Sequence, residues 1–148
     1  MKTKHYREYI AGNFWNKERE LGNEKSLIQN NHLCMASRSN HNIILRGQTG
    51  FDFDGVMHDI GDEVAQTKTA CECLKQLIEE AGGSLQNITK ITLYLTERDF
   101  IETCVPVVDE FFKGIRPCFS LIITKLALPD VWVEIDADVE VDAMEEEK

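Results

Sequence analysis

The stretch Val131-Trp132-Val133-Glu134-Ile135-Asp136-Ala137-Asp138-Val139-Glu140-Val141 alternates over its whole length. Its odd-numbered positions carry only apolar residues, whereas its even-numbered positions carry Trp132 followed by four carboxylates. A repeat of two residues is typical of a strand that is buried on one face. The stretch therefore predicts a strand whose apolar face is covered by other elements.

The acidic face of this strand has two interpretations. It could be the solvated outer face of an antiparallel sheet that is buried on one side only. Alternatively, one of its carboxylates does chemistry in a cleft. Glu134 is the candidate in that case, because it lies beside Trp132 and furthest from the charged C-terminal end.

The rest of the chain supplies helices to cover the apolar face. Apolar residues spaced three and four apart predict a helix over residues 62–81, and a second is expected over 100–113, with a kink or a late start near Pro106. Shorter strands are expected at 33–37, 43–45, 88–95 and 118–126. This order indicates an α+β fold, a mixed β-sheet with two helices packed on one face.

The totals limit the organisation and the partners of the chain. A length of 148 residues fits one domain over 1–148, with a first strand or arm within 1–30 and an acidic tail at 142–148. The net charge of −10 repels phosphate backbones and argues against a nucleic-acid partner. No apolar run approaches the length of a membrane span, and the N-terminus has no apolar leader, so we expect a cytoplasmic protein without membrane contact.

The cysteines and histidines give no sign of a disulfide or a metal site. The five cysteines are odd in number, and the four histidines lack the spacing of metal ligands. We therefore expect free thiols, no metal and no cofactor.

Several segments together resemble the RidA/YjgF family of reactive-intermediate deaminases. They are Ile43-Ile44-Leu45-Arg46-Gly47-Gln48-Thr49-Gly50, Ala65-Gln66-Thr67, Ala81-Gly82-Gly83-Ser84-Leu85, Lys90-Ile91-Thr92-Leu93-Tyr94-Leu95-Thr96, Phe111-Phe112, Arg116-Pro117 and Val133-Glu134-Ile135-Asp136-Ala137. Their order and spacing carry the resemblance from about residue 33 to residue 141. It implies a YjgF-like, chorismate-mutase-like fold and a homotrimer with sites in clefts between subunits. It also implies hydrolysis of enamines and imines, such as 2-aminoacrylate, to 2-keto acids and ammonia.

The residues at the family's site positions differ from the usual ones. Family deaminases carry a carboxylate-binding arginine two residues after the proline that opens a strand; here that proline is Pro117 and the position is Phe119. Leu33 replaces an aromatic residue of the first hairpin, and Arg46 replaces the serine before Gly47. The resemblance thus implies that Arg46, Gly47, Phe119 and Leu33 line the substrate site.

The resemblance leaves two functions open. In the first, Arg46 and the Gly47 amide hold the carboxylate of a small imine, and Glu134 positions or deprotonates the attacking water. Phe119 then favours a more apolar substrate than aminoacrylate. In the second, the chain forms a non-catalytic trimer that binds a small metabolite or has a regulatory role. Arg46 then pairs with Glu134 or Asp136 as an interface salt bridge.

Overall fold

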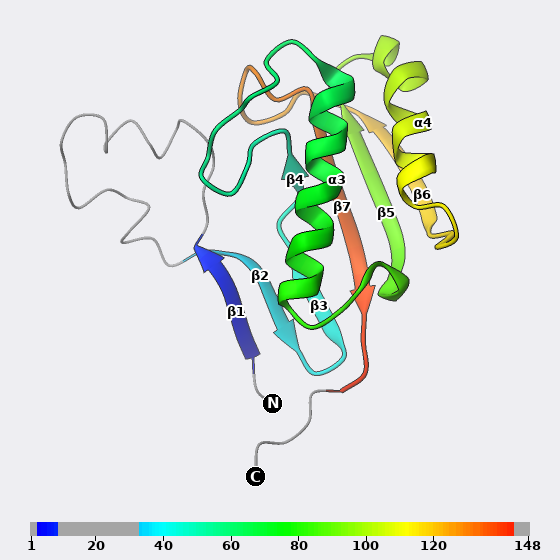
Figure 1. Ribbon diagram of the computed structural model, residues 1–148. Helices are drawn as coiled ribbons and strands as arrows, with labels where there is room; N and C mark the ends of the chain where they lie inside the picture. Colours follow the sequence, from blue (N-terminus) through cyan, green and yellow to red (C-terminus); the bar gives the residue numbers. More distant parts are fainter. Residues whose placement is uncertain (1–2, 9–32, 144–148) are drawn as a thin grey trace, which may run out of the picture.

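Two helices cover one face of a seven-stranded mixed sheet in the computed structural model, which describes residues 3–8 and 33–143 (Figure 1). The elements are β1 (Thr3–Glu8), β2 (Cys34–Ser39), β3 (Asn42–Leu45), β4 (Gln48–Thr49), α3 (Glu63–Glu80), η1 (Leu85–Asn87), β5 (Ile88–Leu95), η2 (Arg98–Phe100), α4 (Ile101–Phe111), β6 (Cys118–Ile123) and β7 (Val133–Glu140). The strand order is β1-β2-β3-β7-β5-β6, and β4 also pairs with β7. Among these strands only β5 and β6 run parallel to each other. The predicted α+β fold is confirmed.

The predicted alternating strand is β7, and it lies in the middle of the sheet. It pairs with β3 and β4 along one edge and with β5 along the other. Its apolar side chains are buried under the helices, whereas the carboxylates are partly buried at Glu134 and Asp136 and exposed at Asp138 and Glu140. The alternation read from the sequence is therefore the alternation between the two faces of the sheet.

Helix α3 begins and ends where its local chemistry requires. The carboxylate of Asp62 accepts a hydrogen bond of 3.0 Å from the amide of Ala65, which caps the first turn. After the last turn, Gly82 adopts a φ of +89°, a conformation that glycine reaches without a steric penalty. The buried stripe of α3 faces β7, and α4 packs beside α3.

Helix α4 differs from its prediction. It begins at Ile101 and continues through Pro106, so the late start expected near the proline is wrong. Proline removes the amide that would bond to the carbonyl of Glu102. Glu102 is exposed, so water can reach that region of the helix and reduce the cost.

Three other boundaries also differ from the sequence expectations. β6 ends at Ile123 rather than at residue 126, and β7 is shorter than the alternating stretch. The two-residue strand β4 is not among the strands expected from the sequence. Each difference lies at an element end or in a very short element, where hydrogen bonding to a distant strand decides the outcome.

The N-terminal strand β1 extends the sheet beyond β2. Arg7 holds it to α3 through two hydrogen bonds to Glu80, of 2.8 and 2.6 Å, and its guanidinium lies 4.1 Å from the centre of the Phe53 ring. The rest of the expected arm and the end of the acidic tail lie outside the described residues.

The sheet face opposite the helices carries no described helix (Figure 1). The paired residues Glu134, Tyr94 and Ile122 form one row across it. Ile122 on this face is 42% exposed, and Ile44 on β3 is 61% exposed. The part of the chain that the structure describes contains no helix that is both long and apolar enough to cross a membrane.

Candidate functional site

Glu134 and Gly47 are in close contact, as the predicted site requires. The pairing of Thr49 in β4 with Glu134 in β7 brings the chain before β4 alongside this carboxylate. A Cβ atom added at Gly47 would lie 2.7 Å from Oε2 and 2.9 Å from Cδ of Glu134. Any side chain at position 47 would therefore displace the carboxylate, and glycine is needed there for a close approach rather than for a turn.

Arg46 is held next to this contact by its own backbone and by its neighbours. Its amide donates to the carbonyl of Met35 at 2.7 Å, and its carbonyl accepts from Nε2 of Gln48 at 2.8 Å. Its Nη1 atom donates to the carbonyl of Gly47 at 3.1 Å. The structure thus brings Arg46, Gly47 and Glu134 together.

The surroundings of Glu134 favour its protonated form. Burial raises the pKa of Glu134, the positive charge of Arg46 opposes that rise, and the nearby charge of Asp136 adds to it. Burial also raises the pKa of Asp136, while a hydrogen bond from the Ala137 amide lowers it. Two neighbouring carboxyl groups on this strand therefore hold protons more strongly than exposed ones do.

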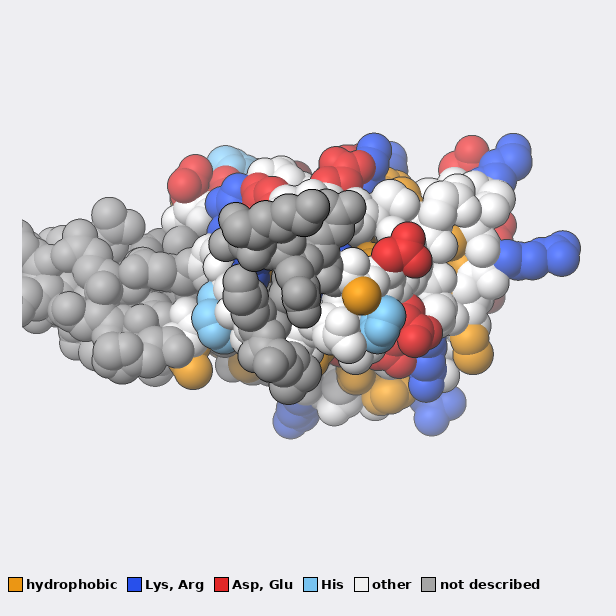
Figure 2. Space-filling view, turned by 90° about the horizontal axis from the view of Figure 1, so that it is seen from below, with side chains coloured by type: hydrophobic (Ala, Val, Ile, Leu, Met, Phe, Trp, Pro, Cys, Tyr) orange, Lys and Arg blue, Asp and Glu red, His pale blue; other side chains and the backbone are white. Residues whose placement is uncertain are grey.

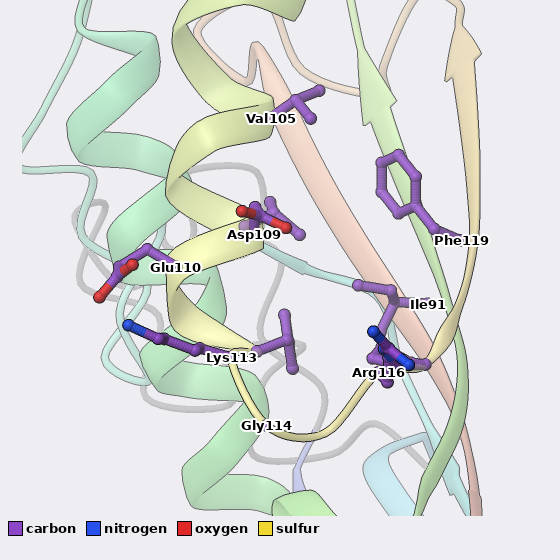
Figure 3. A pocket seen from close by; sticks show the side chains of 11 residues that line it. Ile91, Val105, Asp109, Glu110, Lys113, Gly114, Arg116 and Phe119 are labelled. Atoms are coloured by element: carbon purple, nitrogen blue, oxygen red, sulfur yellow. The ribbon is translucent and has the colours of Figure 1, made fainter.

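Phe119 lies on the other face of the sheet. It pairs with Ile91, which pairs with Ala137, and these positions share the face that carries the helices. There it lines a cavity of about 540 Å³ between α4 and β6 (Figure 3). The structure of this chain does not bring Phe119 to Glu134.

Leu33 lies immediately before β2 and is 58% exposed. The bond from the Arg46 amide to the Met35 carbonyl places the start of β2 beside Arg46. Leu33 is therefore near the Arg46 side of the site rather than near Phe119.

Several cavity residues were missed by the sequence reasoning. Val105 and Asp109 of α4 lie four residues apart and line the cavity together with Arg116, which precedes the strand of Phe119. The spacing of four indicates that Val105 and Asp109 share one face of the helix. The sequence does not show that this face lies opposite β6, because that depends on contacts between distant segments. Among the described residues, no group of three or more histidine, cysteine or acidic side chains is arranged to hold a metal ion.

The thiols vary in exposure but none is bonded to another. Cys71, Cys73 and Cys104 are buried, Cys34 is partly buried and Cys118 is exposed. Burial raises the pKa of Cys71 to about 12 and that of Cys73 to about 11. These two side chains therefore act as small core residues rather than as nucleophiles.

Comparison with known proteins agrees with this architecture. The sequence profile described as endoribonuclease L-PSP matches residues 24–141. A protein described as an endoribonuclease L-PSP, from Entamoeba histolytica, has a similar structure, with a TM-score of 0.72 and 18% sequence identity. The match covers 95% of this chain and 100% of that chain. A member of the YjgF/YER057c/UK114 family from Mycobacterium tuberculosis is 23% identical, with a TM-score of 0.70. The match covers 95% of this chain and 100% of that chain. RidA from an Antarctic Psychrobacter is 22% identical, with a TM-score of 0.67. The match covers 75% of this chain and 89% of that chain.

These structural likenesses show the fold, and the profile match covers most of the chain. The chain therefore belongs to the endoribonuclease L-PSP family, which is the YjgF/RidA family.

Proposed function

We propose that this protein hydrolyses small 2-imino acids or their enamines to 2-keto acids and ammonia. The observation that carries the proposal is the partly buried Glu134 carboxyl group, which lies against Gly47 with the charge of Arg46 close by. A carboxyl group whose pKa is raised toward neutrality is suited to exchange protons with water and substrate.

The chain's own residues have distinct roles in this reaction. Arg46 and the Gly47 amide bind the substrate carboxylate, since a buried carboxylate needs a charged or hydrogen-bonding partner. Glu134 accepts a proton from water as the oxygen adds to the imine carbon. It returns this proton to the nitrogen, which gives a carbinolamine. Glu134 then takes the hydroxyl proton and passes it to the same nitrogen as the carbon–nitrogen bond breaks, so that ammonia leaves and the carbonyl forms.

The proposed cleft joins two protomers of a trimer. Arg46, Gly47 and Glu134 come from one protomer, and Phe119 comes from its neighbour, because one protomer holds these groups on opposite faces of its sheet. No described helix covers this sheet face, and Ile122 is exposed there in the same row as Glu134, which supports an interface at this face.

Light scattering tests the assembly. We expect the mass of a trimer at micromolar concentration, and Ile122→Asp should reduce it by placing a charge on the exposed apolar surface of the proposed interface. Ile60→Asp is the matched control, because Ile60 is 63% exposed and lies outside the sheet. A monomeric wild-type protein would contradict the shared cleft.

Ammonia release tests the reaction. A panel of 2-imino acids is generated in the assay by an amino-acid oxidase, and ammonia and keto acid are followed with and without the protein. Wild type should accelerate release, Glu134→Gln should abolish the acceleration, and Glu140→Gln, on the exposed end of the same strand, should retain it. No acceleration with any imine would reject the enzymatic function.

A non-catalytic ligand-binding trimer is the second candidate, and Phe119 favours it. Phenylalanine cannot replace the charged, bidentate contact of the family's usual arginine. Arg46→Ala separates the two roles of Arg46. If Arg46 binds the substrate, carboxylate affinity falls by roughly ten-fold or more, which is the loss of a charge-assisted hydrogen bond. If Arg46 only pairs with Glu134, the melting temperature falls and wild type shows no carboxylate affinity to lose.

We do not propose endoribonuclease activity for this chain, although the description of the family names it. The chain has a net charge of −10, which opposes binding to a phosphate backbone. On the side shown in Figure 2, the basic side chains of the described residues alternate with acidic ones and do not form a stripe.

A further inference from the structure

The cavity between α4 and β6 has the size of a small-molecule pocket, and its lining combines apolar side chains with charged ones (Figure 3). We infer that it receives the side chain of the substrate, and that the preferred imino acids carry an aromatic or branched side chain. This inference deepens the proposed function and rests on it for the reaction, but binding to the cavity can be measured without any reaction.

The floor of the cavity is apolar. Ile91, Val108 and Phe112 lie at its base and are almost fully buried, so the apolar surface that a ligand can touch includes Phe119, which is 41% exposed, and Val105, which is partly buried. A volume of about 540 Å³ lies within the usual range for small-molecule pockets. A methyl group would leave most of this space unfilled and lose contacts with the walls, whereas a phenyl or isobutyl group would gain them.

The rim of the cavity carries charges that cancel. Asp109 and Glu110 oppose Lys113 and Arg116, so the sum of formal charges is zero. In Figure 3 the side chains of Glu110 and Lys113 point away from Phe119. The rim therefore carries no net charge, and contacts with Phe119 and Val105 favour an apolar side chain.

Phe119 is the residue that makes this floor continuous. It lies opposite Val105 across the cavity, at the position where the family's usual arginine would introduce a cation (Figure 3). Phenylalanine at this position extends the apolar lining to the opening, where the substrate side chain enters. We assign Phe119 and Val105 as residues that determine substrate preference.

Product binding gives the first test. By calorimetry, phenylpyruvate and 4-methyl-2-oxopentanoate should bind wild type more tightly than pyruvate, by roughly ten-fold or more, because each added methylene in an apolar pocket contributes measurably to affinity. Equal affinities for phenylpyruvate and pyruvate would overturn the inference.

A filled cavity gives the second test. Val105→Trp should place an indole in the pocket, weaken phenylpyruvate binding at least ten-fold and leave pyruvate binding within about two-fold. Val107→Trp is the matched control, because Val107 lies on the same helix, is also partly buried and does not line the cavity. Phe119→Ala, which removes apolar lining without adding bulk, should also weaken phenylpyruvate binding. Melting temperatures identify any variant that has lost its fold.

The outcomes separate this inference from the proposed function. Preferential phenylpyruvate binding without ammonia release from any imine supports the pocket and rejects the enzyme. Ammonia release that is equally fast for the imines of alanine and phenylalanine supports the enzyme and overturns the pocket. Val105→Trp with unchanged phenylpyruvate affinity and a native melting curve also overturns it.

Discussion

Glu134 is the residue on which the candidate site depends, and its environment makes stability depend on pH. Its pKa in the folded protein is raised above the ordinary value of 4.5, foremost by burial. Between these two pKa values the folded protein binds more protons than the unfolded chain. The free energy of unfolding therefore falls as pH rises through this window. Below the window Glu134 is protonated in both states, so its ionisation adds no pH dependence.

We predict that Glu134→Gln changes this pH dependence. The variant cannot ionise at this position, so its melting temperature relative to wild type should increase from pH 4 to pH 7. Glu140→Gln, at an exposed site on the same strand, should show no such trend. A constant difference between Glu134→Gln and wild type across this range would show that burial does not govern the ionisation of Glu134.

Gly47 provides a second prediction at the residue scale. In Gly47→Ala the new Cβ would overlap the flexible end of the Glu134 side chain, which can move at little cost to stability. Ammonia release should then fall by roughly 100-fold, because a displacement near 1 Å is enough to misplace a catalytic group.

Gly61→Ala is the contrasting control. Gly61 has a φ of +80°, and a Cβ added there would have no neighbouring atom within 4 Å, so alanine should reduce stability by about 1 kcal/mol and leave activity intact. If Gly47→Ala instead keeps full activity, the contact with Glu134 has no catalytic role.

At the scale of elements, Gln66 connects α3 to the chain that leads into β7. Its buried amide donates to the carbonyls of Asp59 and Asp130, at 3.1 and 3.2 Å, and accepts from the amide of Trp132 at 3.0 Å. Trp132 in turn stacks on Phe100 with ring centres 5.1 Å apart. One helix side chain thus fixes the chain two residues before Glu134.

We predict that Gln66→Leu destabilises the protein by about 3 kcal/mol, because two carbonyls and one amide lose the partner that the buried Gln66 side chain gives them. Urea unfolding measures the change. The matched control Gln76→Leu replaces an exposed glutamine of the same helix and should stay within about 0.5 kcal/mol of wild type. Similar values for both variants would mean that water replaces the Gln66 amide.

Elements with strong local patterns were predictable from the sequence. In β7 the buried residues alternate, and in α3 they recur every three or four positions. Both patterns follow from the period of the element itself, so they can be read from the sequence. β4 was not predictable, because two residues contain no period and Gln48 and Thr49 become a strand only by pairing with β7. The contact between Gly47 and Glu134 was expected from the family resemblance, and the structure adds its geometry.

At the scale of the whole molecule, the face on which a residue lies was the information that the sequence lacked. Phe119 and Glu134 were both expected at one cleft, but the pairing of β6, β5 and β7 places them on opposite faces. The face on which each residue lies is set by the register between distant strands, and a register shift of one residue would move its side chain to the other face. A cleft that uses both residues therefore requires two protomers.

This requirement predicts that damaged protomers complement one another. Glu134→Gln damages one half of the proposed cleft, and Val105→Trp damages the other half for large imines. Each variant alone should be at least ten-fold less active than wild type toward the imine of phenylalanine. In trimers formed from equal amounts of both, about a quarter of the clefts combine two undamaged halves, so about a quarter of wild-type activity should return. Mixing Glu134→Gln with Gly47→Ala should restore nothing, since both changes affect the same half. No recovery in the first mixture, with mixed trimers verified by mass spectrometry, would show that the two faces do not form one site.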